Sequence, residues 1–134
     1  MIKILIINLL FISSSFALDE AAKNTIAKDR KNVTRMVKDG KEFYVKLKKL
    51  HRISGKLNKF RAKKRSKKCA HYEQEFLGEL DYIGNTLKPL KHPFWVYMKG
   101  AVKFGQGCGS CIMKVSKKFC PKMKAMIDKY NDIY

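Results

Sequence analysis

Cysteine is the side chain with the most chemistry to offer in this sequence, and its spacing allows two kinds of site. The chain has four cysteines, in the order Cys69, Cys108, Cys111 and Cys120. A Cys-x2-Cys pair with two further cysteines, and with His71 close to the first of them, suits a tetrahedral zinc ion. An even number of cysteines in a secreted chain instead predicts disulfides, here two of them, with three possible pairings. The compartment decides between these two chemistries.

The amino terminus predicts export from the cell. Lys3 supplies a short basic region, residues 4–12 are apolar apart from one Asn, and small residues precede a cleavage position after Ala17. The apolar run is shorter than the roughly 20 residues that span a bilayer. We therefore expect residues 1–17 to be a signal peptide and residues 18–134 to be a secreted, extracellular protein.

An oxidising compartment favours disulfides over zinc, because thiols pair there first. A bridge between Cys108 and Cys111 would close a very small ring and leave Cys69 to reach Cys120. We prefer two bridges that each leave the Cys-x2-Cys pair, one to Cys69 and one to Cys120. Each closure stabilises the fold by about 2–4 kcal/mol. Which cysteine takes which partner stays open, and we expect no metal and no cofactor.

The three histidines, His51, His71 and His92, do not form a recognisable catalytic set. Glu73 and Glu75 lie near His71 in the sequence, but no nucleophile or oxyanion-binding group accompanies them at a spacing that acid–base catalysis requires. The strand-rich pattern of small basic nucleases and the His-Asp signature of secreted phospholipases are both absent. We expect a protein that is not an enzyme.

Positive charge is concentrated in one segment of the chain. The full chain has a formal net charge of +19, and cleavage of the signal peptide removes only the charge of Lys3 and leaves +18. Between residues 41 and 68, thirteen Lys and Arg residues stand against Glu42 alone. Like charges at i, i+4 cost roughly a few tenths of a kcal/mol each, so a helix selected only for stability would mix the signs. The segment predicts a polyanion-binding surface of Lys48, Lys49, Arg52, Lys56, Lys59, Arg61, Lys63, Lys64, Arg65, Lys67 and Lys68.

The acidic segment that follows offers a structural alternative. Residues 69–86 contain four acids and no Lys or Arg. If this segment folds back antiparallel, its acids neutralise part of the basic segment, although thirteen bases still leave a large excess. The four acids are Glu73, Glu75, Glu79 and Asp81.

Three kinds of polyanion fit the charge. A lysine-rich amphipathic helix can bind an anionic membrane. The paired bases of KKRSKK fit a sulfated glycan, and the basic segment can also bind nucleic acid by counterion release. We expect a secreted, cationic, non-enzymatic protein, effector-like or toxin-like, that attaches to an anionic membrane or a sulfated glycan of a target cell.

Two alternatives stay open. The first is a parasite-type effector that enters a host nucleus, since RAKKRSKK, residues 61–68, also matches a nuclear-import cluster. Such an effector would bind nucleic acid or nuclear proteins there. The second is a four-helix, cytokine-like ligand of a receptor on a host or target cell. The sequence does not predict an oligomeric state.

The run HPFWVYMKG holds the single Trp of the chain. Packing in the core is the expected role of Phe94, Trp95 and Tyr97. Because Trp and Tyr prefer the headgroup zone of a bilayer, a membrane-interface anchor made of the same three side chains is the alternative.

The segment CGSCIMKVSKKFCPKMKAMIDKY, about 23 residues long, resembles the saposin-like family. In that family a Cys-x2-Cys pair opens a basic helix of lipid-interacting proteins. The six-cysteine frame of the family is missing here, and the resemblance implies no site residue in this chain.

Apolar residues recur at helical spacing along most of the sequence, so we expect an all-α fold. One stripe runs from Phe43 to Phe60 in steps of 3 and 4 residues, and a second runs from Tyr72 to Ile83. The prediction is one small domain of four or five helices, stapled by two disulfides. Its amino-terminal helices with the basic segment span residues 18–68, and a cysteine-containing helical unit spans 69–134.

Capping and helix-breaking residues predict where these helices begin and end. Asp19 is an N-cap candidate for a helix that ends at Asp39-Gly40. Three glycines predict a turn over Gly105–Ser110, because glycine makes regular structure costly. Pro121 is expected to break or kink the last helix.

Overall fold

The computed structural model describes residues 18–24, 26–62 and 66–134, apart from the side chains of Lys59, Arg61, Ala62 and Ser66. Residues 18–24 and 26–28 are helical. They are followed by α2 (Arg30–Ala62), α3 (Ser66–Leu87), the 3-10 turn η1 (Pro93–Trp95), α4 (Val96–Cys108) and α5 (Met113–Ile133). The described residues contain no strand, and the predicted all-α fold stapled by two disulfides is confirmed. The predicted signal peptide, residues 1–17, lies outside the described residues.

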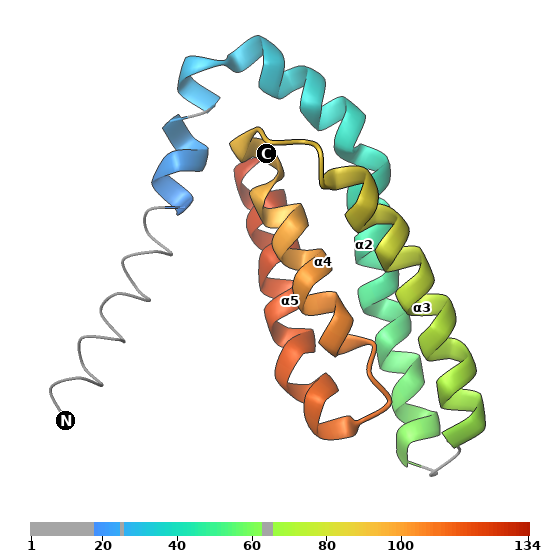
Figure 1. Ribbon diagram of the computed structural model, residues 1–134. Coiled ribbons are helices and arrows are strands. Elements are labelled where there is room, and N and C mark those ends of the chain that lie inside the picture. The colour runs from blue at the N-terminus through green and yellow to red at the C-terminus, as the bar shows by residue number, and fades with distance from the viewer. Residues whose placement is uncertain (1–17, 25, 63–65) are drawn as a thin grey trace, which may run out of the picture.

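Two antiparallel helix pairs lie side by side (Figure 1). α2 and α3 form one pair, α4 and α5 form the other, and their facing apolar side chains form one core. Leu47 of α2, Leu80 of α3, Met98 of α4 and Met123 of α5 are all at most 1 % exposed. The two sequence units predicted on either side of residue 68 therefore share this core, and residue 68 itself lies inside α3.

The helix predicted to end at Asp39-Gly40 does not end there, because α2 continues through both residues. Gly40 is buried, and a Cβ at this position would lie 3.0 Å from a ring carbon of Trp95 and 3.2 Å from the terminal methyl of Met98. The missing side chain lets η1 and α4 approach the backbone of α2. The prediction was wrong because glycine serves close packing here and not a turn.

The helical order is interrupted earlier, at Asp29. Its carbonyl accepts a hydrogen bond from the backbone N–H of Val33, and its carboxylate accepts one from the side chain of Asn32. The first is the i→i−4 bond that opens α2, and the second joins two side chains at its first turn. Asp19, the predicted N-cap, lies inside a helical segment and bonds to Tyr97 instead.

The predicted turn over Gly105–Ser110 is also too long, since α4 continues to Cys108. A Cβ at Gly107 would lie 2.2 Å from the ring of Phe119, and a Cβ at Gly109 would lie 2.2 Å from the ring of Phe76. No real side chain tolerates such distances. Two of the glycines thus let aromatic rings from α5 and α3 pack directly onto the backbone at the end of α4.

Pro121 lies inside α5, so a break, one of the two outcomes predicted for it, does not occur. A proline inside a helix costs about 3 kcal/mol. Cys120 is bonded to Cys108 of α4, and Met123 is fully buried on the next turn. These attachments on both sides of the proline hold the two halves of α5 in one helix.

Candidate polyanion-binding surface

Between residues 48 and 56, the solvent side of α2 carries basic side chains and no acid. On the core side, Leu47, Leu50 and Leu57 are at most 2 % exposed. The helical period places residues 48, 49, 52 and 56 within one opposite face about 100° wide. Four exposed side chains occupy that face, and they are called the α2 cationic face below: Lys48, Lys49, Arg52 and Lys56.

The other members of the predicted surface fall into three groups. Lys67 and Lys68 are exposed at the beginning of α3. Lys59 and Arg61 belong to the last turns of α2, but their side chains are outside the described part of the structure. The remaining three, Lys63, Lys64 and Arg65, lie outside the described residues.

The acids of α3 do not pair with the α2 cationic face, although α3 lies antiparallel to α2 as the structural alternative supposed. Glu73 accepts the backbone N–H of Cys111, and Glu75 lies 3.2 Å from His71 on its own helix. Among the side chains that the structure describes, no member of the α2 cationic face has a carboxylate oxygen within ion-pair distance. Its charge is therefore available to an external anion.

The two disulfides hold the end of the molecule that carries Lys67 and Lys68. Cys69 of α3 is bonded to Cys111, with Cα atoms 5.9 Å apart, and this bridge ties α3 to the turn before α5. Cys108 is bonded to Cys120, with Cα atoms 4.4 Å apart. Both bridges leave the Cys-x2-Cys pair, as predicted, and the structure assigns the partners that the sequence left open.

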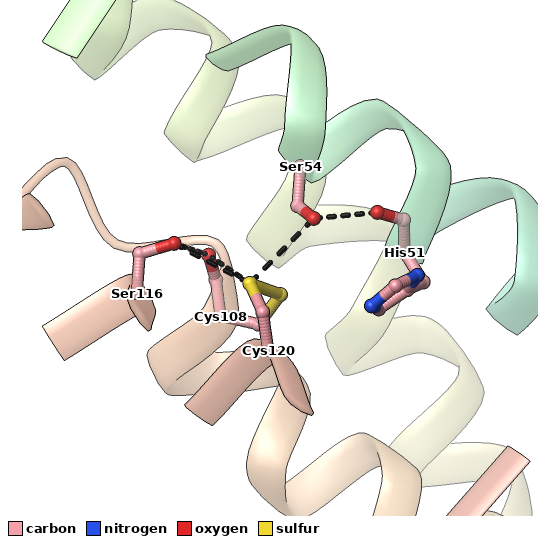
Figure 2. Close-up of a disulfide and its surroundings, with 5 residues drawn as sticks. All are labelled: His51, Ser54, Cys108, Ser116 and Cys120. Atoms are coloured by element: carbon pink, nitrogen blue, oxygen red, sulfur yellow. Dashed lines mark hydrogen bonds between the residues drawn. A yellow bond between two sulfur atoms is a disulfide. The ribbon is translucent and has the colours of Figure 1, made fainter. Parts of the chain in front are cut away.

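The second bridge also forms a contact between helix pairs, which Figure 2 shows. Ser54 of α2 is 3 % exposed and places its Oγ 3.6 Å from the Sγ of Cys120. On the other side, Ser116 of α5 donates its hydroxyl to the carbonyl of Cys108. Two buried hydroxyls and a disulfide thus join α2, α4 and α5 at one point.

The aromatic cluster belongs to the core. Phe94, Trp95 and Tyr97 are 0 %, 5 % and 1 % exposed. Trp95 packs edge-on against Phe43 and Phe94, with ring centroids 6.5 and 4.8 Å apart. The membrane-interface alternative needs these rings at the surface, so the folded structure corrects it in favour of core packing.

None of the groups with clearly shifted pKa values belongs to the α2 cationic face. The hydrogen bond from Tyr97 and the charge of Lys129, 3.5 Å away, hold the pKa of Asp19 below its ordinary value. Burial raises the pKa of Tyr97, Tyr134 and Tyr130, in the last case to about 12. Shifted pKa values often mark active sites, but here they follow from core packing and from the attachment of residues 18–24 to α4 and α5.

The histidines lie apart from one another. His51 is on α2 and His71 is on α3, where it pairs with Glu75. His92 precedes η1, and its Nδ1 accepts the backbone N–H of Phe94, so it serves as a cap. Within the described residues, His, Cys, Asp and Glu side chains form no group of three or more that could hold a metal ion.

One cation that the sequence did not assign to the surface comes from α5. Lys124 lines a cleft together with Lys48 and Arg52. No local signal marks Lys124, because its position depends on how α5 packs against α2.

Comparisons with protein-family models, with curated proteins and with solved structures find no match to this chain. The resemblance of residues 108–130 to the saposin-like family accordingly has no matching family model behind it. Of the helices that the structure describes, none combines the length and the apolar character needed to cross a membrane.

Proposed function

We propose that this protein is a secreted, cationic, non-enzymatic effector that attaches to sulfated glycans of a target cell through the α2 cationic face. The proposal rests on one observation, which is that all four charged side chains of that face are basic. Lys48, Lys49, Arg52 and Lys56 are exposed, and no carboxylate of a described residue pairs with them. A protein surface that keeps uncompensated cations on a rigid helix attracts polyanions by long-range electrostatics and by counterion release.

The burial of apolar groups favours a glycan over a membrane as the partner. A helix that lies in a bilayer interface inserts its apolar face among the lipids. The apolar side of α2 faces the core, and the aromatic rings of Phe94, Trp95 and Tyr97 are buried in the same core. Apart from Val45, the exposed side of α2 next to the α2 cationic face offers charge, which suits a hydrated, sulfated polymer.

Two features support the extracellular part of the proposal. The disulfides Cys69–Cys111 and Cys108–Cys120 are typical of proteins from oxidising compartments. The predicted signal peptide supplies the export route. The nuclear-import alternative depends on residues 61–68, of which 63–65 lie outside the described residues, so the structure adds no support to it.

The connections between helices bear on the cytokine-like alternative. Cytokine bundles run up-up-down-down with long crossover connections. Here neighbouring helices alternate in direction, and short segments join α3 to η1 and α4 to α5. This topology favours the surface-attachment proposal over the receptor-ligand alternative.

Chromatography on immobilised heparin tests the proposal. We expect the disulfide-bonded mature protein to be retained at physiological ionic strength, about 0.15 M, and to elute only at higher salt. It should bind vesicles that contain phosphatidylserine more weakly than it binds heparin. Elution of the native protein at or below physiological salt would rule out attachment to sulfated glycans.

A further inference from the structure

A cleft of about 450 Å³ lies between α2 and α5. Its α2 wall consists of Lys48, His51 and Arg52. The α5 wall consists of Lys124, Ile127 and Asp128. The volume falls in the range of cavities that bind small molecules.

Two contacts between the helices frame this cleft along its length. At one end the rings of Tyr44 and Tyr130 pack with centroids 5.4 Å apart. At the other end Ser54 meets the Sγ of Cys120, next to His51, as Figure 2 shows. Cys120 is itself bonded to Cys108. Because both ends are fixed, the two walls keep their separation without a ligand, and binding needs little reorganisation.

The charges of the cleft select an anion. Lys48, Arg52 and Lys124 are its basic residues, and Asp128 is the acid that opposes them. Arg presents a planar fork of N–H donors that fits two oxygens of one oxyanion, while Lys provides a mobile point charge. Ile127, which is 5 % exposed, belongs to the core and closes the cleft from below.

A second lysine-lined cleft provides a comparison. It has a volume of about 350 Å³, lies where α3 and α4 meet, and is lined by Lys88, Lys91 and Lys99 among others. It contains no arginine, and the ammonium of Lys99 already donates to the carbonyl of Leu90. This cleft therefore has fewer donors for an oxyanion and serves as a matched control.

We propose that the cleft between α2 and α5 is a discrete binding site for a sulfate ester group of a sulfated glycan, with Lys48 and Arg52 on one wall and Lys124 on the other. The inference rests on the proposed function and adds to it a defined site that spans two helices. General attraction to a polyanion involves the whole charge of α2, whereas this site requires a residue of α5.

A small probe separates the site from general attraction. A sulfated disaccharide prepared from heparin is too short to span the whole surface, and a titration followed by backbone amide shifts reports where it binds. We expect shifts in the wild-type protein to gather on both walls of the cleft. Lys48→Gln/Lys124→Gln should weaken disaccharide binding by roughly tenfold, the effect of losing about 1.4 kcal/mol. Asp128→Asn should strengthen it, because the opposing charge is gone.

The control variant Lys88→Gln/Lys91→Gln removes the same charge from the other cleft and should change disaccharide binding by less than about twofold, since charges outside a contact contribute mainly screened attraction. Thermal unfolding of each variant verifies that the fold is intact.

The possible failures are distinct. If heparin retains the wild-type protein but both double variants weaken disaccharide binding equally, the discrete site is refuted while the proposed function stands. If heparin does not retain the wild-type protein, the proposed function itself fails. If Lys48→Gln/Lys124→Gln loses binding to phosphatidylserine vesicles while the disaccharide shows no localised shifts, the site takes a lipid phosphate and the glycan assignment is wrong.

Discussion

Trp95 shows how the surroundings of one residue decide its role. The sequence around it fits either a core or a membrane interface, since both attract large amphipathic rings. In the fold, Gly40 leaves room for the indole and Phe43 and Phe94 pack against it. Gly40 and Phe43 belong to α2, far from Trp95 in the sequence, so the choice between the two roles could not be made from the local sequence.

The burial of Trp95 predicts its fluorescence. Because the indole is 5 % exposed, its emission in buffer should already lie at the blue end of the range that tryptophan shows in proteins. Vesicles containing phosphatidylserine should leave the spectrum unchanged. A red-shifted emission in buffer that moves to the blue with these vesicles would return Trp95 to the membrane interface.

Asp19 and Tyr97 give a second prediction at this scale, which concerns acid stability. The pKa of Asp19 is lowered in the fold, so its ionised form contributes stability above the ordinary pKa, and this stability is lost as pH falls through the folded-state pKa. Tyr97→Phe removes the hydrogen bond and should cost about 1 kcal/mol at neutral pH.

Thermal unfolding between neutral pH and about pH 2 checks this, because that range includes the titration of a carboxyl with a lowered pKa. The difference between wild type and Tyr97→Phe should shrink towards the acid end. A difference that stays constant over the whole range would show that the hydrogen bond does not depend on the charge of Asp19.

At the scale of helices, the apolar period was sufficient to predict that the segments containing Phe43–Phe60 and Tyr72–Ile83 are helical and which side of each faces the core. Leu47, Leu50 and Leu57 are buried as the period requires. The ends of helices were harder to predict. Gly40, Gly105 and Gly107 were interpreted as breaks, whereas the structure uses them for close contacts with side chains that are distant in the sequence. A glycine that ends a helix and a glycine that allows close packing look the same in the local sequence.

Two glycines of α2 provide a matched pair that tests this explanation. Gly55 has no atom within 4 Å of an added Cβ, whereas Gly40 faces the ring of Trp95. Gly55→Ala should stabilise the protein by up to about 1 kcal/mol, through helix propensity alone. Gly40→Ala gains the same propensity but forces Trp95 to move, and overpacking of this kind costs about 1–3 kcal/mol.

Chemical denaturation of both variants decides the point. We expect Gly55→Ala to unfold at a higher denaturant concentration than wild type, and Gly40→Ala at a lower one. Equal stabilisation by the two substitutions would mean that Gly40 is not needed for the approach of Trp95.

At the scale of the whole molecule, charge and disulfides are the parts of the candidate site that the sequence predicts well. Thirteen bases between residues 41 and 68 and the spacing of the cysteines are visible without a structure. The contribution of α5 is not, because Lys124 comes to line a cleft with α2 through the packing of the two helices, which includes the contacts of Tyr44 with Tyr130 and of Ser54 with Cys120. The partners of the acids of α3 could not be predicted from the sequence either, since Glu73 accepts a hydrogen bond from a backbone N–H that is 38 residues away.

The fold as a whole tolerates its charge because two covalent bridges and a single core hold four helices together. Like charges at i, i+4 within the α2 cationic face, with no carboxylate of a described residue at ion-pair distance, weaken the helix slightly. A chain under selection for stability alone would replace some of these bases. Their presence together on one face is the physical basis for assigning them to a partner outside the protein.

The salt dependence of heparin binding tests this assignment most directly. The variant Lys48→Gln/Lys49→Gln/Arg52→Gln/Lys56→Gln removes the α2 cationic face. Its control, Lys88→Gln/Lys91→Gln/Lys103→Gln/Lys117→Gln, removes the same charge from exposed positions elsewhere. The slope of log K against log salt measures the counterions released, at about 0.7 to 0.9 per contact with a nucleic acid backbone and similarly for other dense polyanions.

We expect the α2 variant to bind heparin more weakly than the control and with a clearly smaller salt slope, while its thermal stability equals or slightly exceeds that of wild type. Equal losses of affinity and slope in the two variants would contradict it, because binding would then depend on net charge and not on the α2 cationic face.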